Sequence, residues 1–165
     1  MIDWRTRPSE ERALLNPAFC SSLLWKASRG YTSEGDTALP FELTFLILPI
    51  VLHRATRESL PRSTRTSLSA WLHDHPLSRP VIADRARLLR DFTRGALLFG
   101  GVHGLLEFDG KAVVARADWA QRLASQIGEL SEEVNECARR AEFVGKWFAK
   151  AGTASTVMAV VGVKP

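Results

Sequence analysis

The sequence predicts a mainly helical protein with a small β-hairpin, in which a winged helix-turn-helix core is flanked by additional N-terminal and C-terminal helices. Three observations predict this fold. Residues 93–103 have a helical pattern. Residues 105–114 follow as two apolar runs around Asp109-Gly110, which strongly favours a hairpin. Residues 118–150 carry apolar positions alternately four and three residues apart, as an amphipathic helix does.

The composition is that of a globular protein. The 165 residues are 45% hydrophobic and 24% charged, which is enough apolar material for one domain with a core. A formal net charge of +4 permits an acidic partner without requiring one. Cys20 and Cys137 lie in apolar helical patterns and match no zinc or redox spacing, so we expect buried thiols. Without a signal sequence or an apolar segment of membrane-spanning length, we expect a cytoplasmic protein.

The N-terminal part is expected to be an arm followed by a helix. We expect a flexible arm over residues 1–14 and a single helical domain over residues 15–165. Asn16 and Pro17 predict the start of the first helix, because Asn is a favoured N-cap and Pro fits the first helical turn. Gly30 predicts the end of this helix.

Residues 39–53 are apolar nearly all round, which predicts a helix buried at the centre of the core. Pro40 suits its first turn, whereas Pro49 predicts a kink or an interruption. Residues 53–65 form a basic connector with four arginines and a single acid, Glu58.

The winged-helix module is expected at residues 64–116. Three helices are predicted in it, at residues 66–74, 80–90 and 93–103. A hairpin after three helices is the order of a winged helix. Gly104 suits a left-handed helix end, and Asp109-Gly110 suits a type I′ turn, in which both central residues have positive φ.

The C-terminal helical segment is expected at residues 118–150. Asp118 is predicted to cap a helix that begins at Trp119, with a bend or break near residues 129–131 and a firm helix after it. The apolar tail at residues 153–163 is expected to pack against the rest of the chain.

No residue set requires an enzyme, and we expect no catalytic, cofactor-binding or metal-binding residues. His73-Asp74-His75 suggests a metal, but side chains two residues apart diverge, and a site needs three or four converging ligands. A metal-dependent hydrolase is therefore the weakest of three functions considered. The glycines near residue 100 match neither a P-loop nor a dinucleotide-binding pattern.

Arginines are the candidate contacts to nucleic acid. The helix at residues 93–103 offers only Thr93 and Arg94 for reading bases, so sequence-specific readout is not expected. Contacts to backbone phosphates need no such pattern. The candidates for them are Arg54, Arg57, Arg62, Arg65 and Arg94. Pairing of arginines with neighbouring carboxylates is the alternative.

Binding of another protein would explain the large amount of apolar surface in a small chain. Buried aromatic side chains dominate such interfaces. The candidate interface residues are Trp71, Phe108, Trp147 and Phe148. Packing inside the core explains the two tryptophans equally well.

Short packing and interface segments, rather than catalytic motifs, carry a resemblance to a known family. They are Asn16-Pro17-Ala18, Leu23-Leu24-Trp25, Leu48-Pro49-Ile50-Val51-Leu52-His53, Thr64 to Leu72, Arg85-Ala86, Thr93 to Gly100, His103 to Leu106, Val144 to Ala149 and Gly162 to Pro165. On these segments, from about residue 15 to the C-terminus, the chain resembles the middle component of bacterial three-component ABC systems.

The resemblance implies a small accessory subunit. It would work with an ABC-type ATPase of the DNA-repair and chromosome-organising kind and with a third, effector-linked component, in a bacterial antiviral or anti-plasmid defence system. We expect a non-catalytic adaptor, with sequence-independent DNA contact through the complex and with neither a membrane nor a small molecule as partner. The alternative is a stand-alone winged-helix regulator that binds DNA.

Overall fold

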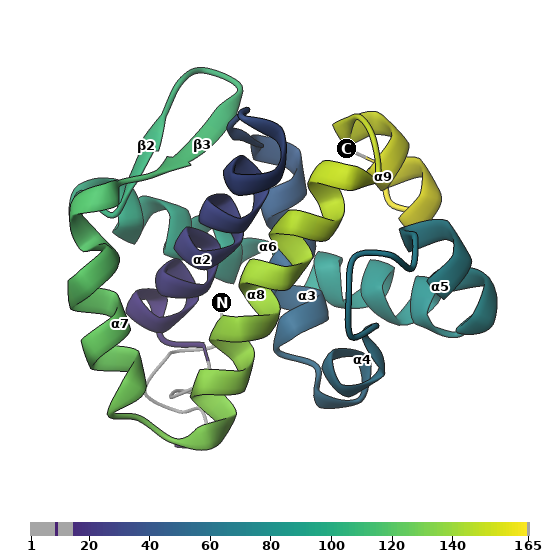
Figure 1. Cartoon of the computed structure of the whole chain (residues 1–165), viewed down its shortest axis with the longest axis horizontal. Helices are drawn as coiled ribbons and strands as arrows, with labels where there is room; N and C mark the ends of the chain where they lie inside the picture. Colours follow the sequence, from purple (N-terminus) through teal and green to yellow (C-terminus); the bar gives the residue numbers. More distant parts are fainter. Residues whose placement is uncertain (1–8, 10–14, 165) are drawn as a thin grey trace.

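The computed structural model describes residue 9 and residues 15–164, and this part is mainly helical with a small three-stranded antiparallel sheet (Figure 1). The elements, in chain order, are α2 (Pro17–Gly35), β1 (Leu39–Pro40), η2 (Phe41–Leu43), α3 (Thr44–Val51), α4 (Arg54–Ser59), α5 (Leu68–Asp74), α6 (Ser78–Val102), β2 (Leu106–Phe108), β3 (Ala112–Ala115), η3 (Ala117–Trp119), α7 (Ala120–Gly128), α8 (Glu132–Lys150) and α9 (Ala154–Val161). The mainly helical class with a hairpin is confirmed. The arm expected over residues 1–14 falls, apart from residue 9, outside the described residues.

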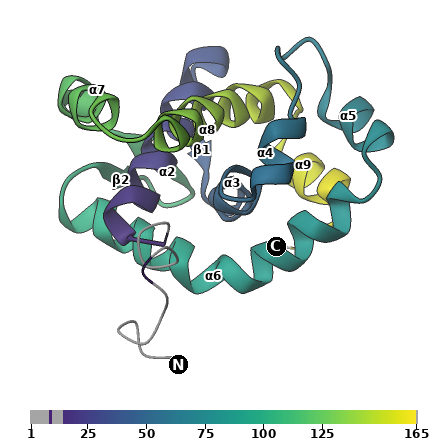
Figure 2. The same cartoon turned by 90° about the horizontal axis from the view of Figure 1, so that it is seen from below.

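Helix α3 is the centre of the core, and Figure 2 shows it enclosed by α2, α6 and α8. All its residues except Phe45 are buried. This confirms the central helix predicted for residues 39–53, although only eight of those residues form the α-helix. Pro49 lies inside α3 and donates no hydrogen bond to the preceding turn, but the helix continues for two more residues to Val51.

Helices α2 and α8 cross at two glycines. A Cβ on Gly30 would overlap the carbonyl of Glu142, and a Cβ on Gly145 would overlap the carbonyl of Ala27. Only glycine therefore lets the two backbones approach this closely. The helix end predicted at Gly30 is wrong, because this glycine serves packing and α2 continues for five more residues.

Strand β3 is the middle strand, with β1 and β2 antiparallel on its two sides. The helical assignment of Leu39-Pro40 is wrong, since both residues pair with β3. The hairpin is confirmed, but its turn is not type I′: Gly110 has a φ of 75°, whereas Asp109 is not left-handed. Helix α2 holds the sheet through Ser28, whose hydroxyl donates to the Val113 carbonyl at 3.0 Å.

Helix α6 is one helix where two were predicted. The separation between residues 80–90 and 93–103 is wrong, because no glycine or proline interrupts the chain between them and the buried face continues from Leu89 to Thr93. Residues 91–92 are therefore helical. Helix α5 and a single long helix precede the hairpin, so the structure does not confirm a winged helix-turn-helix core.

The ends of the remaining helices follow local chemistry. Asn16 caps α2 as predicted, since its side chain accepts a hydrogen bond from the Ala18 amide at 2.8 Å. The predicted break at residues 129–131 is confirmed, and Ser131 caps α8 beyond it. The predicted cap at Asp118 is wrong: its carboxylate pairs with Arg116, and α7 starts after Trp119 without a side-chain cap.

The apolar tail forms α9. Val157 and Val161 on this helix are fully buried, and α9 contacts η2, α5 and α6, so the predicted packing of residues 153–163 is confirmed. In the part of the chain that the structure describes, no helix combines the length and apolar character needed to cross a membrane.

Candidate functional site

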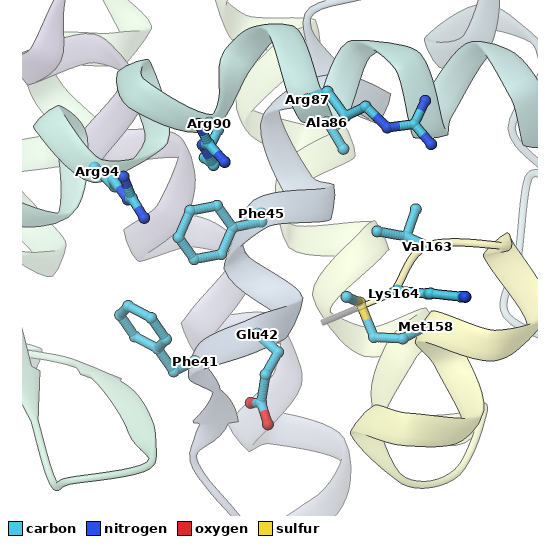
Figure 3. Close-up of a pocket in the computed structure, with 10 residues that line it drawn as sticks. All are labelled: Phe41, Glu42, Phe45, Ala86, Arg87, Arg90, Arg94, Met158, Val163 and Lys164. Carbon is cyan, nitrogen blue, oxygen red and sulfur yellow. The ribbon is translucent and has the colours of Figure 1, made fainter.

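A groove with a volume of about 430 Å³ separates α6 from η2, α3 and the end of the chain after α9 (Figure 3). It joins three segments that are distant in the sequence. The residues that line it are Phe41, Glu42, Phe45, Ala86, Arg87, Arg90, Arg94, Met158, Val163 and Lys164. We call it the α6–α9 groove.

The apolar part of the groove is mainly aromatic. The rings of Phe41 and Phe45 meet edge to face, with centroids 5.5 Å apart. Phe41 also contacts Phe108 of the hairpin, with ring centroids 6.5 Å apart, so the aromatic surface extends from the groove to β2. Phe41 is 39% exposed and Phe108 is 48% exposed, so these two rings present apolar surface to solvent.

The charged part of the groove is strongly basic. Arg87, Arg90 and Arg94 lie three and four residues apart on α6, and Figure 3 shows Arg90 and Arg94 extending toward Phe45. Lys164 lies on the opposite wall, and Glu42 is the single carboxylate among the lining residues.

Two of these arginines have weak local partners. Arg90 and Arg94 lie 3.9 and 3.7 Å from the carboxylate of Asp91, which is beyond hydrogen-bonding distance. Arg87 forms a closer pair with Asp84, at 2.8 Å, but both side chains are exposed to solvent. Exposed pairs of this kind contribute about 0–1 kcal/mol, so the guanidinium groups stay available to another anion.

Helix α6 carries a second feature on its outer face. Large aliphatic side chains recur there with exposures of 69 to 78%. They are Leu77, Leu88, Leu98 and Val102. At 100° per residue these positions fall on one side of the helix, opposite the buried face. Figure 2 shows α6 running along the outside of the molecule, and we call this stripe the α6 outer face.

The structure does not gather the five predicted nucleic-acid contacts on one element. Arg94 lies in the α6–α9 groove, whereas the other four belong to α4 and the loop after it. Arg54, Arg62 and Arg65 are exposed, and Arg54 pairs with Glu58 at 2.7 Å. Arg57 is buried and pairs with Glu133 at 3.0 Å, so in this structure its guanidinium group is turned to the protein rather than to solvent.

Three of the four predicted interface residues belong to the core. Trp71, Trp147 and Phe148 are at most 2% exposed. The two indole rings pack edge to face with centroids 5.5 Å apart, and Trp147 donates to the Thr66 carbonyl at 2.8 Å. In the isolated chain Trp71 and Trp147 join α5 to α8, and Phe148 is buried in the core. Phe108 alone is exposed.

Cysteine and histidine chemistry does not define a site in the described residues. Cys20 and Cys137 are buried thiols, as predicted, and burial raises the pKa of Cys20 to about 12. No group of three or more metal-ligating side chains gathers within residues 15–164. His75 of the predicted trio stacks on Trp71, with ring centroids 5.0 Å apart.

The sequence contains a signal for part of the groove, namely the spacing of three arginines. Arg87, Arg90 and Arg94 share one side of a helix only if α6 is continuous, and the predicted break at residues 91–92 concealed this. Phe41 and Phe45 fall within the segment predicted to be a helix buried on most sides, and this prediction conceals the exposure of Phe41.

A family model described as "ABC-three component (ABC-3C) system Middle Component 3" matches residues 4–165, nearly the whole chain. Neither the curated proteins nor the solved structures provide a match to this sequence.

Proposed function

Because the chain belongs to the Middle Component 3 family of ABC-three component systems, we propose that it is a non-catalytic accessory subunit that binds an ABC-type ATPase and links it to a third, effector-linked component in bacterial defence. A middle component of a multi-component system works with protein partners. The chain's own part in this proposal is to supply binding surfaces.

The α6 outer face is the observation that best supports protein binding. Leu88 and Leu98 leave most of their side-chain surface in water, at 73 and 69% exposure, and Val102 continues the same side. Leu88 and Leu98 are about 15 Å apart along α6, with the exposed Asp91 between them, so they form two separate apolar contacts for a partner. An ATPase helix with its own apolar stripe would cover this face by the side-chain packing that joins two amphipathic helices.

Co-expression tests the proposal. The tagged chain is produced together with an ATPase and a third component encoded beside it, and we expect both to be retained on the affinity resin. Leu88→Glu with Leu98→Glu places charge on the outer face and should lower recovery of at least one component by tenfold or more. Leu130→Glu is the matched control, since Leu130 is an exposed leucine at the distant α7–α8 corner.

A chain that elutes as a monomer without either component would contradict the proposal. If the double variant and the control retain equal amounts of both components, the α6 outer face is not a binding surface for them. The proposal that the chain is an accessory subunit would still stand. Thermal unfolding of each variant shows whether the fold is retained, which the exposure of all three leucines favours.

A stand-alone DNA-binding regulator is the second candidate, because a helix leads directly into a hairpin. Next to that hairpin, however, α6 exposes Leu98 and Val102, where a recognition helix would carry basic and amide side chains. Gel shifts at two salt concentrations distinguish the two functions. Sequence-specific binding favours the regulator. Weak, salt-sensitive binding that is lost with Arg62→Ala and Arg65→Ala favours backbone contact within the complex.

A further inference from the structure

We propose that the α6–α9 groove binds an acidic amphipathic helix from one of the partner proteins, a proposal that rests on the function proposed above and specifies the chemistry of one partner. Apolar side chains of that helix pack against Phe41, Phe45 and Met158. Its carboxylates pair with Arg90 and Arg94 on α6, and with Lys164 on the opposite wall.

The aromatic surface calls for an apolar occupant. Phe41 is partly exposed although its neighbour Phe45 and the whole of α3 are packed against the core. Phe108 extends the exposed aromatic area beyond the groove. Aromatic side chains that keep one surface in water are typical anchors of protein interfaces.

The charge around this surface calls for a negatively charged occupant. Four cationic side chains and one carboxylate line the groove. Arg90 and Arg94 make no close ion pair with Asp91, so their planar guanidinium groups can bind carboxylates through two parallel hydrogen bonds. Charge complementarity of this kind selects the partner and speeds encounter.

The spacing of the arginines fits a helix. Arg87, Arg90 and Arg94 extend over roughly 10 Å of α6, at about 1.5 Å per residue. Carboxylates three and four residues apart on a second helix repeat at the same interval when the two helices run side by side. An extended peptide, with side chains of one face about 7 Å apart, would match this interval less well.

A phosphate-bearing ligand fits the groove less well than a protein does. Phosphate sites use backbone amides at a helix N-terminus or in a glycine-rich loop. Two helix ends reach the groove: the start of η2, where Glu42 places a carboxylate, and the C-terminal end of α9, capped by Gly162. No glycine is among the lining residues, so neither a free helix N-terminus nor a glycine-rich loop is available to a phosphate. The aromatic wall is also larger than recognition of a phosphate requires.

Tiled peptides test the proposal. Fluorescein-labelled 20-residue peptides that cover both co-encoded components are titrated with the full chain, and fluorescence anisotropy is measured. We expect binding by a peptide that carries acidic residues three and four apart beside large apolar ones. Its affinity should fall at least tenfold with Arg90→Glu plus Arg94→Glu, and at least fivefold with Phe41→Ser. Higher salt should weaken it.

The variants separate this proposal from the subunit assignment. Arg122→Glu, which reverses the charge of an exposed arginine on α7, is the control outside the groove and should bind like the wild type. If the wild-type chain retains both full-length components and the groove variants retain them equally, the groove proposal is wrong and the subunit assignment stands. If the chain binds neither component, both fail. Preferential binding of a single-stranded oligonucleotide by the groove arginines would also overturn the proposal.

Discussion

Arg57 shows how one charged side chain joins three helices. It belongs to α4, donates to the Val51 carbonyl at the end of α3 at 2.8 Å, and pairs with Glu133 of α8 at 3.0 Å. Its side chain is only 4% exposed. Since a buried charge is costly unless it is paired, this arginine serves the fold rather than a ligand.

Removing either Arg57 or Glu133 should therefore lower the stability of the fold. We expect Arg57→Ala, and Glu133→Gln to a smaller extent, to lower the free energy of unfolding by about 1–3 kcal/mol, because hydrogen bonds to a buried charge are lost. Urea denaturation measures this. Arg54→Ala is the control: it removes an exposed pair with Glu58 and should change stability by less than about 1 kcal/mol. Equal effects of Arg54→Ala and Arg57→Ala would contradict this account.

His53 gives the fold a dependence on pH. Burial, with the charges of Arg85 and Arg57, lowers its pKa below the ordinary value of 6.5. The unfolded chain therefore binds more protons than the folded chain as the pH falls through 6.5. The free energy of unfolding should decrease from pH 7.5 to pH 5. His53→Gln should flatten this decrease, whereas His73→Gln, which changes an exposed histidine on α5, should not.

Urea denaturation at several pH values gives the free energy of unfolding as a function of pH. Parallel curves for the wild type and His53→Gln would show that His53 does not contribute to the pH dependence. The hydrogen-bonded contact between His53 Nδ1 and Thr56 Oγ1, at 2.7 Å, also holds the start of α4, so the variant is compared by slope and not by absolute stability.

Among the helices, α2 and α8 approach each other closely where they cross. Gly30 and Gly145 each lie against backbone of the other helix. A methyl group there cannot be relieved by turning a side chain, so the two helices would have to separate.

Gly145→Ala should thus destabilise the protein by about 1–3 kcal/mol, as overpacking of a core does. Gly95→Ala is the matched control. Gly95 is also inside a helix but has no atom within 4 Å of the added methyl group, so alanine should stabilise by about 0.5–1 kcal/mol through its higher helix propensity. Thermal unfolding compares the two. A loss of stability in both variants would show that the crossing is not the cause.

Helix ends with a local cause were predictable. Asn16, the break at residues 129–131 and the left-handed Gly104 all follow from the chemistry of one or a few neighbouring residues. The end at Gly30 was not, because that glycine lies against a distant helix. In the sequence, a glycine that ends a helix cannot be distinguished from a glycine that allows a second helix to pack closely against the first. The continuity of α6 was visible in the sequence, since no glycine or proline separates residues 80–90 from residue 93.

Across the whole molecule, α3 connects the parts. It contacts α2, α6 and α8, so helices from the N-terminal, middle and C-terminal parts of the chain share one core. We therefore expect the single domain predicted over residues 15–165 to unfold in one cooperative transition.

Two probes check this in urea. Far-UV circular dichroism follows all helices. Tryptophan fluorescence follows the five tryptophans, among them Trp25 on α2 and the Trp71–Trp147 pair at the α5–α8 contact. The two transitions should coincide. Separated midpoints would show that α5 and α9 unfold independently of the rest.

The α6–α9 groove could not be read from the sequence, because residues 41–45, 86–94 and 158–164 come together only in the folded chain. The mainly helical class and the central helix α3 could be predicted from the sequence, since apolar periodicity is a local property. Of the residues predicted for a functional surface, Arg94 lies in the groove and Phe108 lies beside it. The others that are buried, Arg57, Trp71, Trp147 and Phe148, were predicted from their residue type, which does not show whether a side chain faces solvent.

The uninterrupted course of α6 has a mechanical consequence. Its 25 residues form a rod of roughly 37 Å, at about 1.5 Å per residue. A rod without a hinge cannot shorten or fold, so proteins gripping its two ends are kept at a constant separation. In an assembly driven by ATP, such a rigid spacer would pass a movement from one neighbour to the other without absorbing it.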